Sequence, residues 1–234
     1  MKKEKTLSEN LFDLIKIFGF IIIVSLPLSL IMIASSLSTN SPIYIDVLIS
    51  IILLALILFI IKLTLNYYRN VSKKQLLTLS KKDVLKDILY LLAIRIIVVI
   101  LTIASSTIFK SDTTSNDQLL LDFGKNTSLP YFIAFILCII IIAPLFEELV
   151  FRGIFPELFF QNKYKNLTMI VSSAIFASLH GFDNIISFSM YFLMGLILYL
   201  AYQRKGNLSD SILVHALNNS IGAIALIVMY FTIS

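Results

Sequence analysis

Residues 131–153 decide the fold class of this chain, and they read YFIAFILCIIIIAPLFEELVFRG. Positions 131–146 carry no charge, and an α-helix needs about 20 mainly apolar residues to cross the hydrocarbon core of a bilayer. Glu147, Glu148 and Arg152 then follow inside the same hydrophobic stretch. Charged side chains are costly in lipid and persist where they pair or face a polar interior, so the stretch predicts a membrane helix with a polar site.

The composition of the whole chain indicates the same class of protein. Of 234 residues, 58% are hydrophobic and 14% are charged, and the mean hydropathy is +0.93. These values lie far from those of an ordinary soluble domain and predict an all-α, polytopic transmembrane helical bundle. Seven membrane helices are expected, or eight if the last span breaks near Gly222. The spans are expected at about 11–37, 43–66, 87–109, 130–159, 167–181, 184–202 and 208–232.

The basic residues predict how the bundle sits in a cell membrane. With a cytoplasmic N-terminus, 13 Lys and Arg residues lie in cytoplasmic segments, and only Lys110 and Lys125 lie outside. This bias follows the positive-inside rule, so the net charge of +5 indicates orientation and contact with membrane lipids, not a nucleic-acid partner. Seven spans place the C-terminus outside. The 13 residues are Lys2, Lys3, Lys5, Arg69, Lys73, Lys74, Lys81, Lys82, Lys86, Lys163, Lys165, Arg204 and Lys205.

Helical spacing separates the charges of the first motif. Each residue of an α-helix advances about 100°, so Glu148 and Arg152, four positions apart, lie on one face and can form an ion pair. Glu147 lies about 140° from Arg152 and is expected to remain a free carboxylate. Pro144 cannot donate a backbone hydrogen bond, which predicts a local kink or a widened cavity. Arg95, deep in the third span, is interpreted as a structural residue that pairs with another helix.

Both histidines of the chain also fall in apolar spans. His180 ends the motif FASLH, and His215 begins HALNN, in which Asn219 lies four positions further along the same helix. A rise of about 1.5 Å per residue allows Glu147, His180 and His215 to share one layer, in the cytoplasmic half or the centre of the bilayer. These residues, from three different spans, can therefore form one site.

The residue types of this set suit hydrolysis by water. A carboxylate and an imidazole can together hold a water molecule and remove its proton for attack on a carbonyl group. A second imidazole and an amide can then stabilise the oxyanion. Two histidines and a glutamate also match zinc ligands by type, although no H-E-x-x-H spacing is present. The single cysteine, Cys138, cannot form an intramolecular disulfide and is interpreted as a small buried hydrophobe.

The three motifs together resemble a known family. EELVFR has the form E-E-x-x-x-R, FASLH the form F-x-x-x-H and HALNN the form H-x-x-x-N, in this order on successive spans. The set resembles the CPBP family of intramembrane glutamic endopeptidases, which includes the type II CAAX prenyl endopeptidases and bacterial proteins linked to bacteriocin processing or self-immunity. The resemblance covers about residues 130–233. It implies that 130–234 is the catalytic core, and that 1–129 supplies N-terminal transmembrane helices and loops of the same bundle.

The resemblance also implies roles for the polar residues. The first glutamate and the first histidine would activate water, while the second histidine and the asparagine would form the oxyanion site. No bound metal would be needed, although the residue types leave zinc open. The implied catalytic residues are Glu147, His180, His215 and Asn219, and the implied structural support of the site is Glu148 and Arg152.

These expectations favour an intramembrane endopeptidase that cleaves a membrane-associated peptide or a lipid-anchored protein, in peptide maturation or in bacteriocin processing or immunity. Two other functions fit parts of the sequence. A catalytically silent immunity or partner protein would share the fold, and a proton-coupled transporter could use Glu147 and the histidines as a relay. The chain shows no repeated halves of the kind common in transporters, which disfavours the last function. The sequence carries no signal for an oligomeric state.

Overall fold

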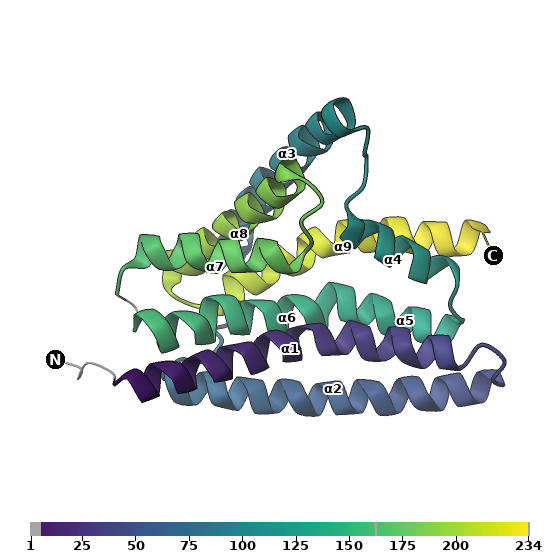
Figure 1. Cartoon of the computed structure of the whole chain (residues 1–234), viewed down its shortest axis with the longest axis horizontal. Helices are drawn as coiled ribbons and strands as arrows, with labels where there is room; N and C mark the ends of the chain where they lie inside the picture. Colours follow the sequence, from purple (N-terminus) through teal and green to yellow (C-terminus); the bar gives the residue numbers. More distant parts are fainter. Residues whose placement is uncertain (1–5, 162, 234) are drawn as a thin grey trace.

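Helices form nearly all of the chain in the computed structural model, which describes residues 6–161 and 163–233 (Figure 1). No strand occurs within these residues, which confirms the predicted all-α class. Lys2, Lys3 and Lys5, which entered the topology prediction, lie outside the described residues. The α-helices are α1 (Leu7–Leu37), α2 (Ile43–Ser72), α3 (Lys81–Phe109), α4 (Ser115–Lys125), α5 (Leu129–Leu137), α6 (Ala143–Glu148), α7 (Lys165–Leu179), α8 (Ile185–Lys205) and α9 (Leu208–Ile233). The π-helical segments are η1 (Cys138–Ile142), η2 (Leu149–Ile154) and η3 (Pro156–Phe160).

Six helices of the described residues are long and apolar enough to cross a membrane, one fewer than predicted. The exception is α7, which was expected as a span over 167–181. It has 15 residues, or about 22 Å of helix, which is shorter than the roughly 30 Å of hydrocarbon. The break considered near Gly222 is absent, because α9 runs without interruption from Leu208 to Ile233.

The span Leu129–Phe160, which combines α5, η1, α6, η2 and η3, lies at the centre of the bundle. Within its most apolar stretch 56% of the residues are buried, against 17% or less in each of α1, α2 and α3. Figure 1 shows α5 and α6 as a layer between α1 and α2 on one side and α7 on the other. Protein surrounds this span, so it can hold charged side chains that lipid would disfavour.

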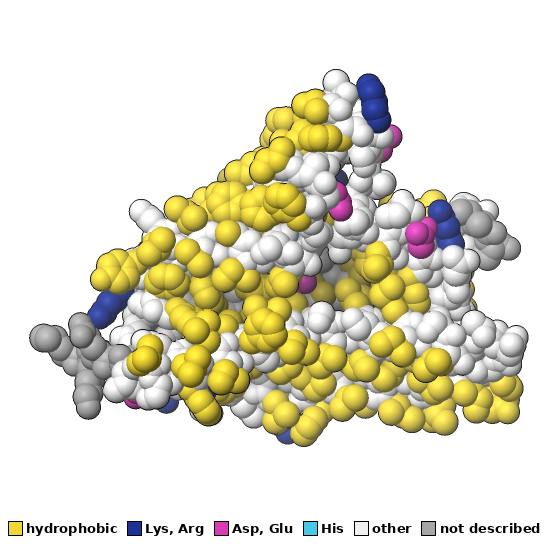
Figure 2. Space-filling view, in the orientation of Figure 1, with side chains coloured by type: hydrophobic (Ala, Val, Ile, Leu, Met, Phe, Trp, Pro, Cys, Tyr) yellow, Lys and Arg dark blue, Asp and Glu magenta, His cyan; other side chains and the backbone are white. Residues whose placement is uncertain are grey.

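The main hydrophobic core joins the first two helices to this central span. Ile31 of α1 and Ile57 of α2 are fully buried together with Phe135 and Phe146. The outer faces of the helices are apolar as well, and Figure 2 shows hydrophobic side chains over most of one face, with few charges. A soluble monomer rarely exposes apolar surface on this scale, so the exterior suits contact with acyl chains.

The polar segment between α3 and α5 contains a helix, α4, that was not predicted. The start of α4 contacts the end of α7 and the start of α8. Thr114 shares a hydrogen bond of 3.0 Å with the Tyr191 hydroxyl, and the Ser115 N–H donates to Asp183 at 2.8 Å. Hydrogen bonding by Ser115 lowers the pKa of the Asp183 carboxyl group. The connection after the short α7 therefore reaches the segment that was predicted to lie outside.

An ion-pair network joins the starts of α3 and α9 to the end of α8. Arg204 contacts Asp83 at 3.0 Å and Asp87 at 3.1 Å, and it also contacts Asp210. Lys205 adds contacts of 3.0 Å to Asp83 and 3.4 Å to Asp210. The side chains of Asp87 and Asp210 have no exposed surface, so their charges depend on these cations.

Substitution of Arg204 by Met is expected to destabilise the bundle by roughly 3–5 kcal/mol, because two buried carboxylates lose their main counter-charge. The measurement is the thermal unfolding midpoint of the full chain in detergent. Arg69→Met is the matched control, since Arg69 is exposed near the end of α2, and its midpoint should stay close to that of the unsubstituted chain. Equal midpoints for the two variants would show that the network contributes little.

Candidate active site

The central span departs from α-helical geometry on both sides of the two glutamates. Glu147 and Glu148 end α6, with η1 before this helix and η2 after it. Pro144 stands in the first turn of α6 and has no N–H to donate. The Ala143 N–H donates to the Cys138 carbonyl, five residues back. Widened turns of this kind are frequent at functional sites, and here the kink expected at the proline takes the form of π-helix.

Glu148 and Arg152 form the ion pair expected from their spacing. Nη1 of Arg152 lies 3.1 Å from Oε1 of Glu148, and both side chains are fully buried. Nη2 of Arg152 donates to the Gly195 carbonyl at 3.1 Å, and the guanidinium lies 4.7 Å from the Phe176 ring centroid. A Cβ at Gly195 would lie 3.1 Å from the Ser173 Cα, so glycine permits the close approach of α7 and α8 here. The arginine therefore ties the central span to both helices.

Glu148 also binds His215, which the sequence did not predict. Nδ1 of His215 lies 2.9 Å from Oε1 of Glu148, and His215 is buried. A carboxylate paired with an arginine accepts hydrogen bonds, so Nδ1 carries the hydrogen in this contact. The other ring nitrogen, Nε2, lies 3.8 Å from Oε2 of Glu147. Glu148 thus orients the ring toward its neighbouring glutamate.

His180 is held in the same way by a different acceptor. Nδ1 of His180 lies 2.8 Å from the Phe176 carbonyl, so it donates, and Nε2 lies 3.8 Å from Oε2 of Glu147. The imidazole stacks on the Tyr191 ring at a centroid distance of 4.6 Å. His180 is the C-cap of α7, and the next residue, Gly181, turns the chain with a φ of +96° that favours glycine.

Glu147 therefore faces both histidines, while Arg152 neutralises the adjacent glutamate. Glu147 is 9% exposed, and its Oε2 atom has no hydrogen-bond partner among the described residues. The two contacts of 3.8 Å are longer than a direct hydrogen bond. Two imidazole Nε2 atoms and one carboxylate oxygen thus converge from three segments of the chain without binding one another directly.

Asn219 is held at the site by a backbone carbonyl that Pro144 leaves without a helical donor. Its Nδ2 atom donates to the Ile139 carbonyl at 3.1 Å. Because the Ala143 N–H bonds to Cys138 and Pro144 has no N–H, the Ile139 carbonyl lacks its usual helical donors. The asparagine satisfies this acceptor, and its amide keeps a second N–H for another group.

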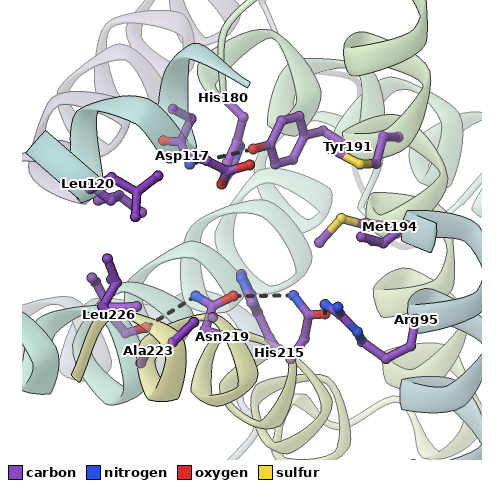
Figure 3. Close-up of a pocket in the computed structure, with 18 of the residues that line it drawn as sticks. Arg95, Asp117, Leu120, His180, Tyr191, Met194, His215, Asn219, Ala223 and Leu226 are labelled. Carbon is purple, nitrogen blue, oxygen red and sulfur yellow. Dashed lines mark hydrogen bonds between the residues drawn. The ribbon is translucent and has the colours of Figure 1, made fainter. Parts of the chain in front are cut away.

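A cavity of about 330 Å³ lies beside these residues. His180, His215 and Asn219 line it, and Figure 3 shows the two histidines on opposite walls. Leu120 of α4 and Leu226 of α9 supply apolar surface on another side. Figure 2 shows a recess on one face of the molecule, between the layer that contains α7 and the layer that contains α5 and α6.

Five polar residues of the cavity wall were not predicted as site residues. They are Arg95, Asn116, Asp117, Tyr191 and Asn218. Asn116 and Asp117 belong to α4, whose polar sequence gave no signal for the site. Tyr191 has no sequence signal that separates it from other aromatic residues of its span. Asn218 stands next to Asn219 in HALNN, so the doubled asparagine was the available signal. Arg95 was interpreted as structural, and its contact with another helix is a hydrogen bond to Asn218 at 3.4 Å.

The residues that could hold a metal ion are Glu147, His180 and His215, through the atoms described above. Over 6–161 and 163–233, no group of three or more His, Cys, Asp or Glu side chains has the arrangement of a metal site. Nδ1 of each histidine is already held by a protein acceptor, so only the two Nε2 atoms remain for any further ligand.

Comparison with known proteins gives a family match over the part of the chain that carries the three motifs. Residues 129–221 match the family described as "Type II CAAX prenyl endopeptidase Rce1-like". The UPF0177 protein YaiH of Lactococcus lactis subsp. lactis (strain IL1403) is 34% identical over 161 residues, which is 67% of this chain and 61% of YaiH. The UPF0177 protein YvdC of the same strain is 33% identical over 139 residues, covering 58% of this chain and 51% of YvdC.

A third relative, an uncharacterized 24.3 kDa protein of Escherichia coli, is 34% identical over 99 residues, which is 41% of this chain and 45% of that protein. The chain thus spans about half to three fifths of the length of these curated relatives. No solved structure matches. Residues 129–221, which contain the charged motif of the central span and both histidines, are therefore similar to the type II CAAX prenyl endopeptidase Rce1-like family.

Proposed function

We propose that this chain is an intramembrane endopeptidase that hydrolyses a peptide bond of a membrane-associated substrate. The observation that carries the proposal is the convergence of His180 Nε2 and His215 Nε2 on one oxygen of Glu147, each at 3.8 Å. That oxygen has no hydrogen-bond partner among the described residues. Among the described residues Glu147 has no direct ion pair with lysine or arginine, and a buried carboxylate of this kind, flanked by two imidazoles, suits general-base chemistry.

In the proposed reaction, Glu147 and His180 accept hydrogen bonds from the attacking water. His180 can accept at Nε2 because its Nδ1–H is committed to the Phe176 carbonyl. The water oxygen bonds to the carbonyl carbon of the substrate while one water proton moves to the Glu147 carboxylate. The carbon–nitrogen bond then breaks, and the proton moves from Glu147 to the leaving nitrogen. The products are a carboxylic acid and an amine.

His215 and Asn219 are proposed to stabilise the oxyanion that forms during attack. Asn219 offers the N–H that does not bind Ile139. His215 can donate from Nε2 when its ring carries both protons, while Glu148 holds the Nδ1–H. Glu148 and Arg152 are proposed as support, since they orient this ring and do not face the reacting atoms.

The substrate is proposed to be a membrane peptide or a lipid-anchored protein. The chain is proposed to lie in the cell membrane with a cytoplasmic N-terminus. The C-terminus is proposed to be external, because the short α7 would bring the chain to the external segment that Asp183 contacts, in addition to the six long spans. The apolar walls of the cavity and the lipid-facing exterior support a hydrophobic substrate. The family description, which names prenyl endopeptidases, supports a lipid-anchored one. Peptide maturation and bacteriocin processing or immunity are the proposed settings.

The proposal is tested with His180→Ala and His215→Ala in the full chain, reconstituted in liposomes with a pool of fluorogenic apolar peptides. Each substitution is expected to lower cleavage by roughly 10²- to 10⁴-fold, because each removes a group that contacts water or the oxyanion. Lys62→Ala is the control, since Lys62 is exposed on α2 and away from the cavity. Cleavage by both histidine variants at the control rate would refute the proposal.

Metal dependence is measured in the same assay. Glu147 and His180 are proposed to activate water without a metal ion, so cleavage should persist in excess chelator. Loss of cleavage in chelator, with recovery on addition of zinc, would instead assign Glu147, His180 and His215 as zinc ligands.

A further inference from the structure

We propose that Arg95, together with Asn218, binds a carboxylate of the peptide substrate and so determines which peptides the site accepts. The inference rests on the proposed function, because it assigns the cavity beside Glu147 to substrate. It adds a chemical class to that substrate: a peptide with a carboxylate group near the scissile bond and apolar side chains on the other side of the cavity.

Arg95 lies far from both ends of its helix. It is the central residue of α3 (Lys81–Phe109), so about 21 Å of helix separates it from either end. Its side chain is half-buried and lines the cavity. Lipid headgroups gather near the ends of a membrane helix, so this position favours an anion that enters the cavity over a lipid phosphate.

The guanidinium of Arg95 has few partners in the protein. It donates one hydrogen bond, to the Asn218 amide oxygen at 3.4 Å, although a guanidinium carries five N–H donors. Within the part of the chain that the structure describes, no carboxylate oxygen lies within 4 Å of it. Two other arginines, Arg152 and Arg204, are both bound by aspartate or glutamate. Among the described residues, Arg95 is thus a cation inside the bundle without a direct ion pair, and the carboxylate that shares its cavity, Asp117, does not contact it.

Asn218 links Arg95 to the proposed oxyanion site. Its Oδ1 atom accepts from Arg95, and its Nδ2 atom donates to Asn219 Oδ1 at 3.4 Å. These two hydrogen bonds and the amide between them span less than about 10 Å, a few residues of extended peptide. A carboxylate bound by Arg95 would therefore belong to a residue close to the bond that is cleaved.

The remaining walls of the cavity favour one orientation of such a peptide. Figure 3 shows Arg95 and Met194 on one side, Leu120, Ala223 and Leu226 on the opposite side, and Asp117 of α4 near His180. The Asp117 carboxylate repels a substrate carboxylate, so the negative group of a bound peptide would lie at Arg95 and its apolar side chains would lie toward Leu120, Ala223 and Leu226. Arginine is well suited to the polar end, because its planar fork matches both oxygens of a carboxylate.

The test measures binding without hydrolysis, in full chain that carries Glu147→Gln, in nanodiscs of phosphatidylcholine. The probes are fluorescein-labelled Leu-Ala-Leu-Ala-Leu-Ala with a free C-terminal carboxylate, the same peptide with a C-terminal amide, and two amides in which the penultimate residue is Glu or Gln. We expect the free acid, the Glu-containing amide, or both to bind roughly 10- to 100-fold more tightly than their neutral counterparts. The acid–amide pair tests a terminal carboxylate, and the Glu–Gln pair tests a side-chain carboxylate.

Variants of Arg95 assign the preference to this residue. Arg95→Gln should reduce the preference for the charged probe to less than about twofold, and Arg95→Lys should retain part of it. Arg69→Gln removes an exposed arginine from α2 and should leave the preference unchanged. Equal binding of charged and neutral probes, including no binding of either, would overturn the inference, and so would a preference that survives Arg95→Gln in a folded variant.

The same peptides separate this inference from the proposed function. Cleavage of acid and amide by the chain with Glu147 intact, followed by mass spectrometry, reports hydrolysis independently of the binding preference. A carboxylate preference without any cleavage would leave the Arg95 site in place and refute the protease. Cleavage with equal use of charged and neutral peptides would leave the protease in place and refute the Arg95 site.

Discussion

Substitution of Glu147 by Gln is expected to lower peptide hydrolysis by roughly 10²- to 10⁴-fold while the bundle stays folded. Gln has nearly the shape of Glu, but its amide cannot accept a proton from water. The substitution breaks no direct hydrogen bond to either histidine, because both histidine contacts of Glu147 are 3.8 Å long. The measurements are the cleavage rate of a fluorogenic peptide in liposomes and the unfolding midpoint in detergent.

The control for Glu147→Gln is Asp122→Asn, which neutralises an exposed carboxylate of α4 that binds Gln118. This variant should cleave at the rate of the unsubstituted chain. Glu147→Asp should also be slow, because the shorter side chain moves the carboxylate away from both imidazoles. Full activity of Glu147→Gln would remove this glutamate from the mechanism, and a loss of activity that accompanies unfolding would assign it a structural role.

Substitution of Arg152 by Met is expected to destabilise the chain by about 3–5 kcal/mol, the largest effect on stability that we predict for the site. The guanidinium is fully buried, and its removal leaves the Glu148 charge without its cation in a region closed to water. It also removes the hydrogen bond to the Gly195 carbonyl and the contact with Phe176. The unfolding midpoint in detergent measures the loss.

The double variant Glu148→Gln/Arg152→Met separates the buried charge from the lost packing. Neutralising both partners removes the uncompensated charge, so the double variant should be clearly more stable than Arg152→Met alone. The Gln oxygen can still accept the Nδ1–H of His215, which preserves the ring orientation. If Arg152→Met unfolds at the temperature of the unsubstituted chain, the pair does not support the site.

The helices of this protein were predictable from the sequence because membrane spans depend on local hydrophobicity and length. The six long spans lie close to their predicted positions. Hydrophobicity did not report two features: that the predicted helix α7 is too short to count among the long spans, and that α4 exists. α7 is apolar but only 15 residues long, and its limits depend on the left-handed residue Tyr164 before it and on Gly181 after it. α4 lies in a polar segment without an apolar run, where hydrophobicity carries no signal.

Part of the site could likewise be predicted from the spacing of residues within one helix. Glu148 and Arg152 share a helix and a face, so spacing alone predicted their pair. The separation of Glu147 from that pair followed from the same spacing. The contact between His215 and Glu148 joins residues 67 positions apart, and no local rule anticipates it. The roles of Arg95, Asn218 and Tyr191 in the cavity wall likewise depend on how α3, α8 and α9 pack.

The sequence by itself determined the class of protein, its helices and the three motifs, because these depend on hydrophobicity and on the geometry of single helices. The tertiary structure alone decided that Nε2 of His180 and Nε2 of His215 meet at one oxygen of Glu147. The tertiary structure also decided that Nδ1 of His180 binds the Phe176 carbonyl and that Nδ1 of His215 binds Glu148. It placed Arg95 in the wall of the resulting cavity. Three helices must pack before such distances exist, and packing depends on the shape of many side chains distant in sequence.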